Sequence, residues 1–316
     1  MITPQTENIQ LAQALGLSVS LYLKREDQHP LGSHKGRSIP LMIDKYAAAG
    51  IKNFVISSSG NAALAAAKYI ADKPELTLTV FVGKNIDREK LSTITNIVKQ
   101  SHKNQGIASS PPEADPRNDI VIQQVSNPKQ SAFQLDKQGL TKNLRQSTDD
   151  NALMGYYDLA KELSEIKNLS AVFIPTSSGT TAQGLYEGFQ KIGINPQIHI
   201  VQTEACNPFC HPRENGDPVV ECLDSRLRGN DNSSLATAIV DKVAHRKNKI
   251  SEILKNSRGQ GWIINNEEIT TSIKLVTQTT GQIISPNSAL AIAGLAQALR
   301  SGKKFSGSVA VIFTGR

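Results

Sequence analysis

Short runs of apolar residues alternate along the chain with longer stretches of helical periodicity. Seven runs are predicted to be β-strands, and several of them are wholly apolar, as strands buried in a parallel sheet are. They cover residues 21–23, 54–56, 78–82, 120–125, 171–174, 198–201 and 309–313. Strands that alternate with helices predict an α/β fold with parallel sheets.

The stretches between these strands predict helices. They cover residues 38–49, 62–71, 88–99, 152–165 and 181–191. Two more helices are expected near the end of the chain. Asn266 precedes the first, whose opening turn contains Glu267 and Glu268. An amide cap and acidic first-turn residues both stabilise a helix N-terminus. The second helix is predicted over 287–300, directly after Pro286.

Two segments interrupt the alternation of strands and helices. Residues 104–118 contain a Ser-Ser-Pro-Pro run, and residues 207–234 are rich in Pro, Gly, Asn, Asp and Arg with almost no apolar periodicity. Such segments are typical of long irregular loops. We therefore predict that both are insertion loops, disordered and without a catalytic role.

The length and charge of the chain narrow the class of protein. The 316 residues suffice for one or two globular domains that bury a core without disulfides. The net charge of +7 permits a nucleic-acid partner or an anionic small ligand. The one compact basic cluster, residues 245–249, has no interleaved aromatic residues and is interpreted as a solvated face. We therefore expect no nucleic-acid partner.

Membrane and metal association are not expected either. No apolar run approaches the ~18 residues that a membrane span needs. Residues 1–7 have neither a basic nor an apolar region of the kind that directs export, so a cytoplasmic location is expected. The three cysteines, Cys206, Cys210 and Cys222, lie near His211, but their spacing does not fit a zinc site, and we expect no metal.

Lys35 lies in the first of three turn-like segments that stand between a strand and a helix. Residues 32–37 read Gly-Ser-His-Lys-Gly-Arg, which places Lys35 at the entry of a helix. A lysine there is expected to face the end of the sheet, and partial burial lowers the pKa of an amine, which suits a nucleophile or a Schiff base. The alternative is a surface lysine at a helix start.

The other two turn-like segments are rich in hydroxyl groups and glycine. Residues 57–61, Ser-Ser-Ser-Gly-Asn, follow a strand and precede a helix, where free amides favour a carboxylate or phosphate. A plain capped turn is the alternative for them. Residues 175–184 also join a strand to a helix, and their small residues let the backbone approach an anion. They match neither the P-loop nor the dinucleotide-binding fingerprint.

Together, these segments resemble the fold-type II pyridoxal-phosphate enzymes. Residues 21–37 resemble the cofactor-lysine region of that superfamily, and residues 57–61 resemble its serine-glycine-asparagine loop. Residues 177–181 stand where its phosphate loop is found, and residues 309–315 resemble its closing strand. The superfamily includes the tryptophan synthase β chain, threonine synthase, serine and threonine dehydratases and cysteine synthase.

The resemblance implies an α/β fold with two open, mostly parallel twisted sheets flanked by helices. It implies a larger cofactor-binding domain made of residues 1–40 and 150–316, and a smaller substrate-side domain made of residues 41–149. Homodimers are usual in the superfamily, so a homodimer that acts on a small amino-acid substrate is expected.

The resemblance also implies roles for individual residues. Lys35 binds pyridoxal 5'-phosphate as a Schiff base and takes the α proton of the substrate. Asn61 hydrogen-bonds the ring hydroxyl, and Thr314 meets the pyridine nitrogen. The residues that hold the cofactor phosphate at a helix N-terminus are Ser178, Gly179, Thr180 and Thr181. The residues that receive the substrate carboxylate are Ser57, Ser58 and Ser59.

Within the superfamily, residues 234–239 contain an Ala-Thr-Ala-Ile run that resembles threonine synthase. This predicts conversion of O-phosphohomoserine to threonine and phosphate, with Arg37, Lys84 and Arg88 as candidate ligands of the substrate phosphate. The alternatives are a serine/threonine dehydratase (an ammonia-lyase) and a β-replacement enzyme like cysteine synthase. An alternative from another class is a catalytically inactive relative that binds pyridoxal phosphate or another ligand.

Overall fold

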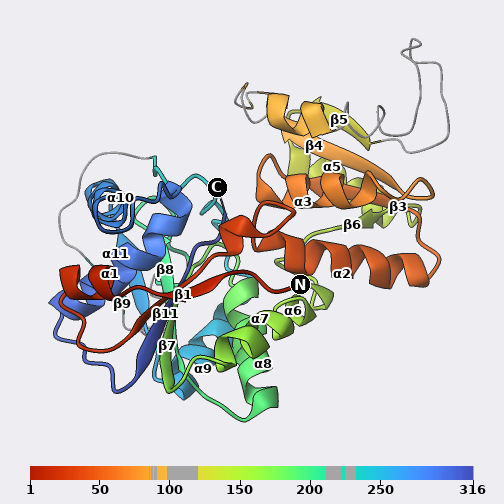
Figure 1. The fold of residues 1–316 in the computed structure, drawn as a ribbon. Helices are drawn as coiled ribbons and strands as arrows, with labels where there is room; N and C mark the ends of the chain where they lie inside the picture. Colours follow the sequence, from red (N-terminus) through yellow and green to blue (C-terminus); the bar gives the residue numbers. More distant parts are fainter. Residues whose placement is uncertain are drawn as a thin grey trace, which may run out of the picture. The chain divides into compact units, whose positions relative to one another are not determined.

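The computed structural model describes residues 1–84, 86, 88, 91–97, 120–210, 222–224 and 233–315. The chain divides into two compact units, each with its own sheet (Figure 1). One unit consists of Met1–His29 and Leu153–Arg316, and its described residues form a sheet of seven strands. The other consists of Pro30–Ala152, and its described residues form a sheet of four strands. We call them the seven-stranded unit and the four-stranded unit.

The sheet of the seven-stranded unit is parallel except at one edge. In spatial order its strands are β1 (Gln5–Glu7), β2 (Leu21–Lys24), β11 (Ser308–Ile312), β7 (Leu169–Pro175), β8 (Gln197–Thr203), β10 (Gly261–Ile264) and β9 (Cys222–Asp224). Only β1 runs antiparallel to its neighbour, β2. The carboxyl ends of the other six strands therefore share one edge of the sheet, where ligands bind in open α/β sheets.

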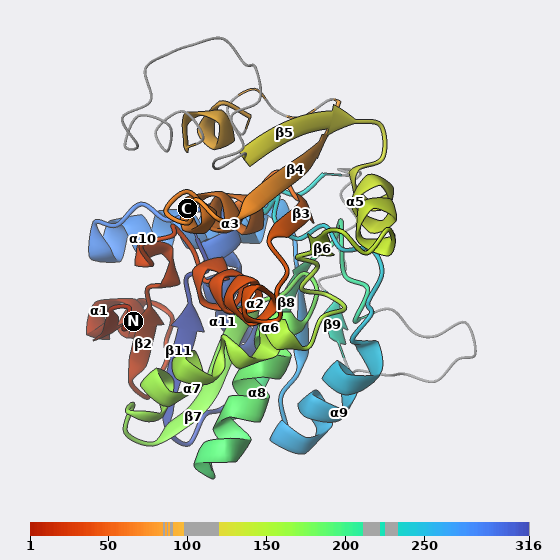
Figure 2. The same ribbon diagram turned by 90° about the vertical axis from the view of Figure 1, so that its right-hand side faces the viewer.

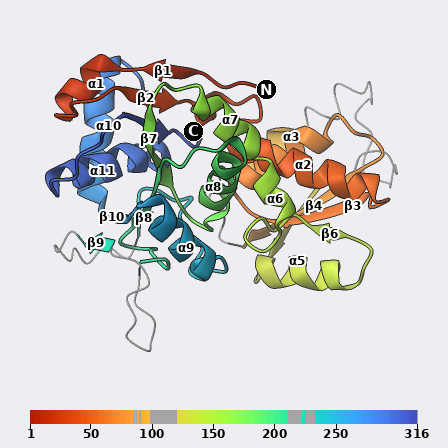
Figure 3. The same cartoon turned by 90° about the horizontal axis from the view of Figure 1, so that it is seen from below.

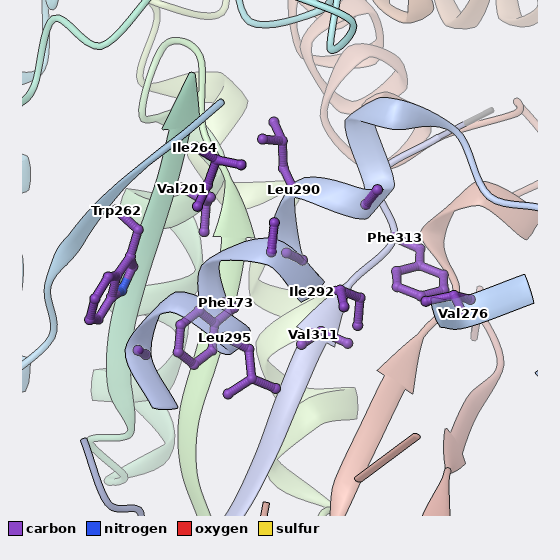
Figure 4. Close-up of a cluster of buried hydrophobic side chains, with 14 of the residues drawn as sticks. Phe173, Val201, Trp262, Ile264, Val276, Leu290, Ile292, Leu295, Val311 and Phe313 are labelled. Carbon is purple, nitrogen blue, oxygen red and sulfur yellow. The ribbon is translucent and has the colours of Figure 1, made fainter. Parts of the chain in front are cut away.

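Helices cover both faces of this sheet (Figure 3). One face carries α1 (Ile9–Ala14), α10 (Asn266–Thr280) and α11 (Pro286–Arg300), and the other carries α7 (Tyr157–Ser164), α8 (Thr180–Ile192) and α9 (Lys247–Ser257). Alternate residues of β7 pack on opposite faces, so Phe173 joins the core under α11 whereas Val172 and Ile174 join the core under α8. Figure 4 shows the first of these cores.

A buried aromatic cluster lies in the core of Figure 4, where Phe173 and Trp262 are labelled. The His199 ring stacks on Phe173 with the ring centroids 4.4 Å apart, and the Trp262 indole N–H donates to His199 Nδ1 at 3.1 Å. Because Nδ1 accepts a hydrogen bond, the imidazole proton resides on Nε2, 3.2 Å from Gln197 Oε1. Burial holds the pKa of His199 well below its ordinary value, and the charge of Lys303 lowers it further.

The sheet of the four-stranded unit is wholly parallel. Its strands in spatial order are β5 (Ile120–Val125), β4 (Thr77–Gly83), β3 (Asn53–Ser57) and β6 (Lys142–Asn143). Helices α2 (Lys35–Ala48) and α3 (Asn61–Ile70) lie on one face and α5 (Pro128–Lys137) on the other (Figure 2). Short segments outside the sheets are η1 (Glu26–Gln28) and α6 (Asn151–Met154).

The structure confirms the predicted α/β fold with two mostly parallel sheets flanked by helices. Each of the seven predicted runs lies in a strand, apart from Phe313, which directly follows β11. The runs in β3, β7, β8 and β11 are buried, as is typical of parallel strands, whereas β5 lies at the edge of its sheet and has exposed residues. The predicted helix cap is wrong by one residue, since Asn265 caps α10 in a capping box with Glu268. Of the predicted helix 88–99, the described residues 88 and 91–97 are helical.

The predicted insertion loops lie largely outside the described residues. Loop 104–118 falls wholly there, as do 211–221 and 225–232 of the second loop. Where residues 207–234 are described, the prediction of a loop without packed structure is wrong at two places. Phe209 is fully buried, and Cys222–Asp224 forms β9, which pairs with β10. No helix in the described part of the chain is long and apolar enough to cross a membrane.

Candidate active site

Lys35 is the first residue of α2 in the four-stranded unit. The turn before it contains Gly32, whose φ is +88°, a backbone conformation that glycine adopts at little energetic cost. Ser33 Oγ accepts a hydrogen bond from the Lys35 backbone N–H at 3.3 Å and so helps to fix the helix entry. The Lys35 side chain is partly exposed, whereas Gly36 and Arg37 behind it are buried. Lys35 is thus partly exposed at a helix entry whose backbone is hydrogen-bonded.

The serine turn of the same unit joins β3 to α3. Ser57 ends β3 and Asn61 begins α3, so residues 57–61 stand at the carboxyl edge of the parallel sheet. Ser58 Oγ accepts a hydrogen bond from the Gly60 N–H at 3.2 Å, which tightens the turn. The Ser57, Ser58, Ser59 and Asn61 side chains are all partly exposed. A helix N-terminus with accessible hydroxyl groups suits a carboxylate.

The third segment, residues 177–181, joins β7 to α8 in the seven-stranded unit, and we call it the phosphate cradle. Gly179 is left-handed, with φ of +80°, and an added Cβ would come within 3.0 Å of Phe209 and Ile250. Ser178 and Thr180 are buried, and their hydroxyl oxygens are 2.9 Å apart. The first N–H groups of an α-helix have no acceptor within the helix, and its dipole favours an anion there.

The Ser177 side chain forms hydrogen bonds to a neighbouring segment of the chain, residues 240–241. Its Oγ accepts hydrogen bonds from the Val240 and Asp241 N–H groups and donates to Asp241 Oδ2, each at 3.2 Å. This hydroxyl therefore ties the cradle to residues 240–241, and the other hydroxyl groups of the cradle are those of Ser178, Thr180 and Thr181.

Thr314 shares an edge of the sheet with the phosphate cradle. It follows β11, which pairs in parallel with β7, and the cradle follows β7. The Thr314 side chain is buried, and the next carbonyl, of Gly315, accepts hydrogen bonds from the Ser285 and Ser288 hydroxyl groups at 2.5 and 2.9 Å. These contacts to the start of α11 fix the backbone beside Thr314.

Sequence reasoning assigned no role to Arg25, which supports the Thr314 side of the sheet. Arg25 Nε and Nη2 donate to the two carboxylate oxygens of Asp27 at 2.8 and 2.7 Å. The guanidinium also lies 5.6 Å from the ring centroid of Phe313. It thus links the chain leaving β2 to the residue before Thr314.

The candidate ligands of a substrate phosphate differ in burial. Arg37 is only 9% exposed, whereas Lys84 and Arg88 are exposed. The described residues contain no group of three or more His, Cys, Asp or Glu side chains arranged to hold a metal ion. Cys206 is buried and forms no disulfide, and His211 lies outside the described residues.

The fold and these loops define a class of enzyme, and comparison with known proteins bears this out. The chain belongs to the family of pyridoxal-phosphate dependent enzymes, whose sequence profile matches residues 2–315. This finding confirms the family and the cofactor that the sequence predicts.

Two kinds of relative are similar in sequence. Human L-serine dehydratase/L-threonine deaminase is 28% identical over 199 residues, which are 60% of this chain and 53% of the human protein. The chain thus spans about half the length of that relative. Threonine synthase of Bacillus sp. (strain ULM1) is 22% identical over 317 residues, 99% of this chain and 82% of the relative. Threonine synthase of Halalkalibacterium halodurans is 23% identical, over 94% of this chain and 77% of the relative.

Solved structures share the fold. A pyridoxal 5'-phosphate-dependent aspartate racemase superposes with a TM-score of 0.76 at 18% identity, over 100% of this chain and 90% of that one. Serine racemase from Dictyostelium discoideum superposes with a TM-score of 0.76 at 19% identity, over 99% of this chain and 91% of that one. At such identities the likeness shows the fold alone.

The residues present fit this cofactor. A phosphate monoester needs a close backbone approach, and left-handed Gly179 at the start of a 13-residue helix provides it. The aldehyde needs an accessible amine, and Lys35 is partly exposed at the entry of α2. A pyridine nitrogen needs a hydrogen-bonding partner, and Thr314 follows β11 at the same edge of the sheet as the cradle.

Proposed function

We propose that the protein catalyses pyridoxal-phosphate-dependent elimination and replacement on a small amino acid, as a threonine synthase. In this reaction O-phosphohomoserine loses phosphate from its γ carbon, water supplies the β hydroxyl, and threonine is formed. Coverage of the chain supports this choice, because the two threonine synthases described above align over 94% and 99% of it. The human dehydratase aligns over 60%.

Three residues are proposed to hold and use the cofactor. Lys35 binds it covalently through Nζ, Asn61 donates to its ring hydroxyl, and Thr314 meets its ring nitrogen. Bound pyridoxal phosphate supplies an electron sink for negative charge at the substrate's α carbon. Lys35 Nζ, released when the substrate binds, takes the α proton. Because the Thr314 hydroxyl is neutral, it does not favour protonation of the ring nitrogen, which moderates the electron sink.

The anionic groups are proposed to bind at helix N-termini. The cofactor phosphate binds at Ser178–Thr181, where the positive end of α8 and the buried hydroxyls favour a dianion. The substrate carboxylate binds at Ser57–Ser59, at the start of α3. Both assignments place charge where backbone N–H groups have no acceptor inside the helix.

A serine/threonine dehydratase is the second candidate, favoured by the higher identity of 28% to the human dehydratase. A dehydratase needs a β-hydroxyl leaving group and a carboxylate site, whereas a threonine synthase must also bind the phosphate of its substrate. β-Replacement on O-acetylserine is a further alternative.

We also propose that the protein is a homodimer and that it is cytoplasmic. Sedimentation of the purified protein tests the homodimer.

The purified protein should be incubated separately with O-phosphohomoserine, serine, threonine and O-acetylserine. We expect phosphate and threonine in equal amounts from O-phosphohomoserine, with inhibition by added phosphate and by salt. The Lys35→Ala variant is the matched control and should form neither product. Pyruvate from serine or 2-oxobutyrate from threonine, with no phosphate from O-phosphohomoserine, would replace this proposal with the dehydratase. No product from any substrate, despite bound cofactor, would indicate the inactive relative.

A further inference from the structure

A segment that follows the second insertion contacts both the phosphate cradle and the first turn of α8. We call residues 240–246 the brace. At the first end, the Val240 and Asp241 N–H groups donate to Ser177 Oγ, which donates in turn to Asp241 Oδ2. At the second end, Arg246 Nη1 donates to Gln183 Oε1 at 2.9 Å. The brace thus contacts Ser177, directly before the buried Ser178, and Gln183, in the first turn of α8.

Arg246 is buried, although it belongs to the basic cluster 245–249 that the sequence indicated to be solvated. Arg246 is only 8% exposed and directly precedes α9. Gln183, its acceptor, donates to Glu187 Oε1 at 2.8 Å, and the Tyr157 hydroxyl donates to Glu187 Oε2 at 2.9 Å. The solvated-face interpretation is therefore wrong for Arg246, and a hydrogen-bonded chain ties its guanidinium to α8.

The position of this charge is electrostatically unusual. The N-terminus of α8 already carries the positive end of the helix dipole, which repels a nearby cation and attracts an anion. A buried guanidinium beside the first turn adds to that positive potential at low effective dielectric. A phosphate dianion in the cradle would be attracted by both and opposed by the Asp241 and Glu187 carboxylates, so loss of the guanidinium should weaken the binding of a ligand that carries a phosphate.

We propose that Arg246 is a positioning residue for the cofactor phosphate. Through Gln183 it fixes the first turn of α8, and its charge makes the protein select pyridoxal phosphate over pyridoxal, which lacks the phosphate. This inference rests on the proposed function, in which Ser178–Thr181 hold the phosphate. Arg246 touches neither substrate nor reacting atoms in this role.

The size of the effect follows from Coulomb's law. Arg246 contacts Gln183, the fourth residue of α8, so we take a separation of roughly 10 Å between the guanidinium and an anion at the start of α8. At an effective dielectric constant of about 20, this separation corresponds to a change in affinity of about tenfold or more for each unit of phosphate charge.

The test compares the affinities of the full-length protein for pyridoxal phosphate and for pyridoxal, measured by absorbance titration after the cofactor has been removed. In Arg246→Met, the dissociation constant of pyridoxal phosphate should rise at least about tenfold, and that of pyridoxal should change less than about twofold. Arg246→Lys, which keeps the charge, should recover most of the selectivity. Arg258→Met removes an exposed arginine at the other end of α9 and should behave like the wild type.

If Arg246→Met does not fold, Arg246→Gln retains a hydrogen-bond donor toward Gln183 without the charge and should show the same loss of selectivity. A variant that weakens both ligands equally, or neither, would overturn the inference and leave Arg246 a purely structural residue. A wild type that binds both ligands equally would overturn the assignment of the phosphate cradle itself. The two failures are therefore distinguishable.

Discussion

Acidification should destabilise the seven-stranded unit through His199. The His199 residue is 0% exposed, it accepts the Trp262 N–H at Nδ1, and burial holds its pKa well below the ordinary value of 6.5. In the unfolded chain the same imidazole titrates normally. Below pH 6.5 the unfolded state binds more protons than the folded state. The contribution of neutral His199 to the free energy of unfolding is therefore fully present above pH 6.5 and is lost as the pH falls.

The magnitude follows from linkage between proton binding and folding. When the pH falls from about 7.5 to about 5.5, a histidine that stays neutral in the folded state lowers the free energy of unfolding by about 1.4 kcal/mol. The His199→Phe variant keeps a ring against Phe173 but cannot titrate. At about pH 7.5, where the wild-type imidazole is neutral in both states, the variant should be less stable by about 1–3 kcal/mol, because the Trp262 N–H loses its acceptor. Its stability should depend less on pH than that of the wild type, by the same ~1.4 kcal/mol.

Urea unfolding followed by the fluorescence of Trp262 measures this difference. The chain has a single tryptophan, and it lies in contact with His199, so the signal reports the unit in question. Other titrating groups are common to both proteins and cancel when the two pH dependences are subtracted. Equal pH dependence in the wild type and the variant, or greater dependence in the variant, would refute the assignment of a neutral buried His199.

Two further substitutions test the packing of the same unit. Lys24→Met should cost about 3–5 kcal/mol in urea unfolding, because it leaves the buried Glu162 carboxylate without its ion pair, and the double variant with Glu162→Leu should cost less. A single variant no less stable than the double variant would contradict this. Gly259→Ala should prevent stable folding, since its Cβ would lie 1.8 Å from the Ile198 carbonyl oxygen, whereas Gly83→Ala, with no atom within 4 Å, should keep a melting temperature close to that of the wild type. Comparable melting temperatures for both glycine variants would show that the contact at Gly259 is not rigid.

The strands and the candidate loops could be predicted because their signals are local. An apolar run such as 171–174 indicates a strand without reference to the rest of the chain, and glycine and hydroxyl residues mark the turn after it. Strand β10 was missed because Gly261–Ile264 has only four residues and a glycine among them. Strand β6 was missed because its two residues, Lys142–Asn143, carry no apolar pattern.

The supporting contacts could not be predicted from local pattern. Arg246 meets Gln183 across 63 residues of sequence, and a run of basic residues usually indicates a solvated face. One signal was present: Arg246 lies four residues before Ile250, on the face of α9 that also buries Ile253 and Leu254. Phe209 was assigned to an insertion for a similar reason, because the polar residues that follow it hid one buried aromatic side chain.

The central claim is that this chain binds pyridoxal phosphate covalently through Lys35. Reduction of the purified protein with borohydride, followed by peptide mapping, tests it most directly. We expect the reduced cofactor on the peptide that contains Lys35, and loss of the cofactor's absorbance in a folded Lys35→Ala variant. Lys24 is the internal control, because it is fully buried in its ion pair with Glu162 and should carry no label. A label on Lys24 or on the exposed Lys84, with none on Lys35, would contradict the account.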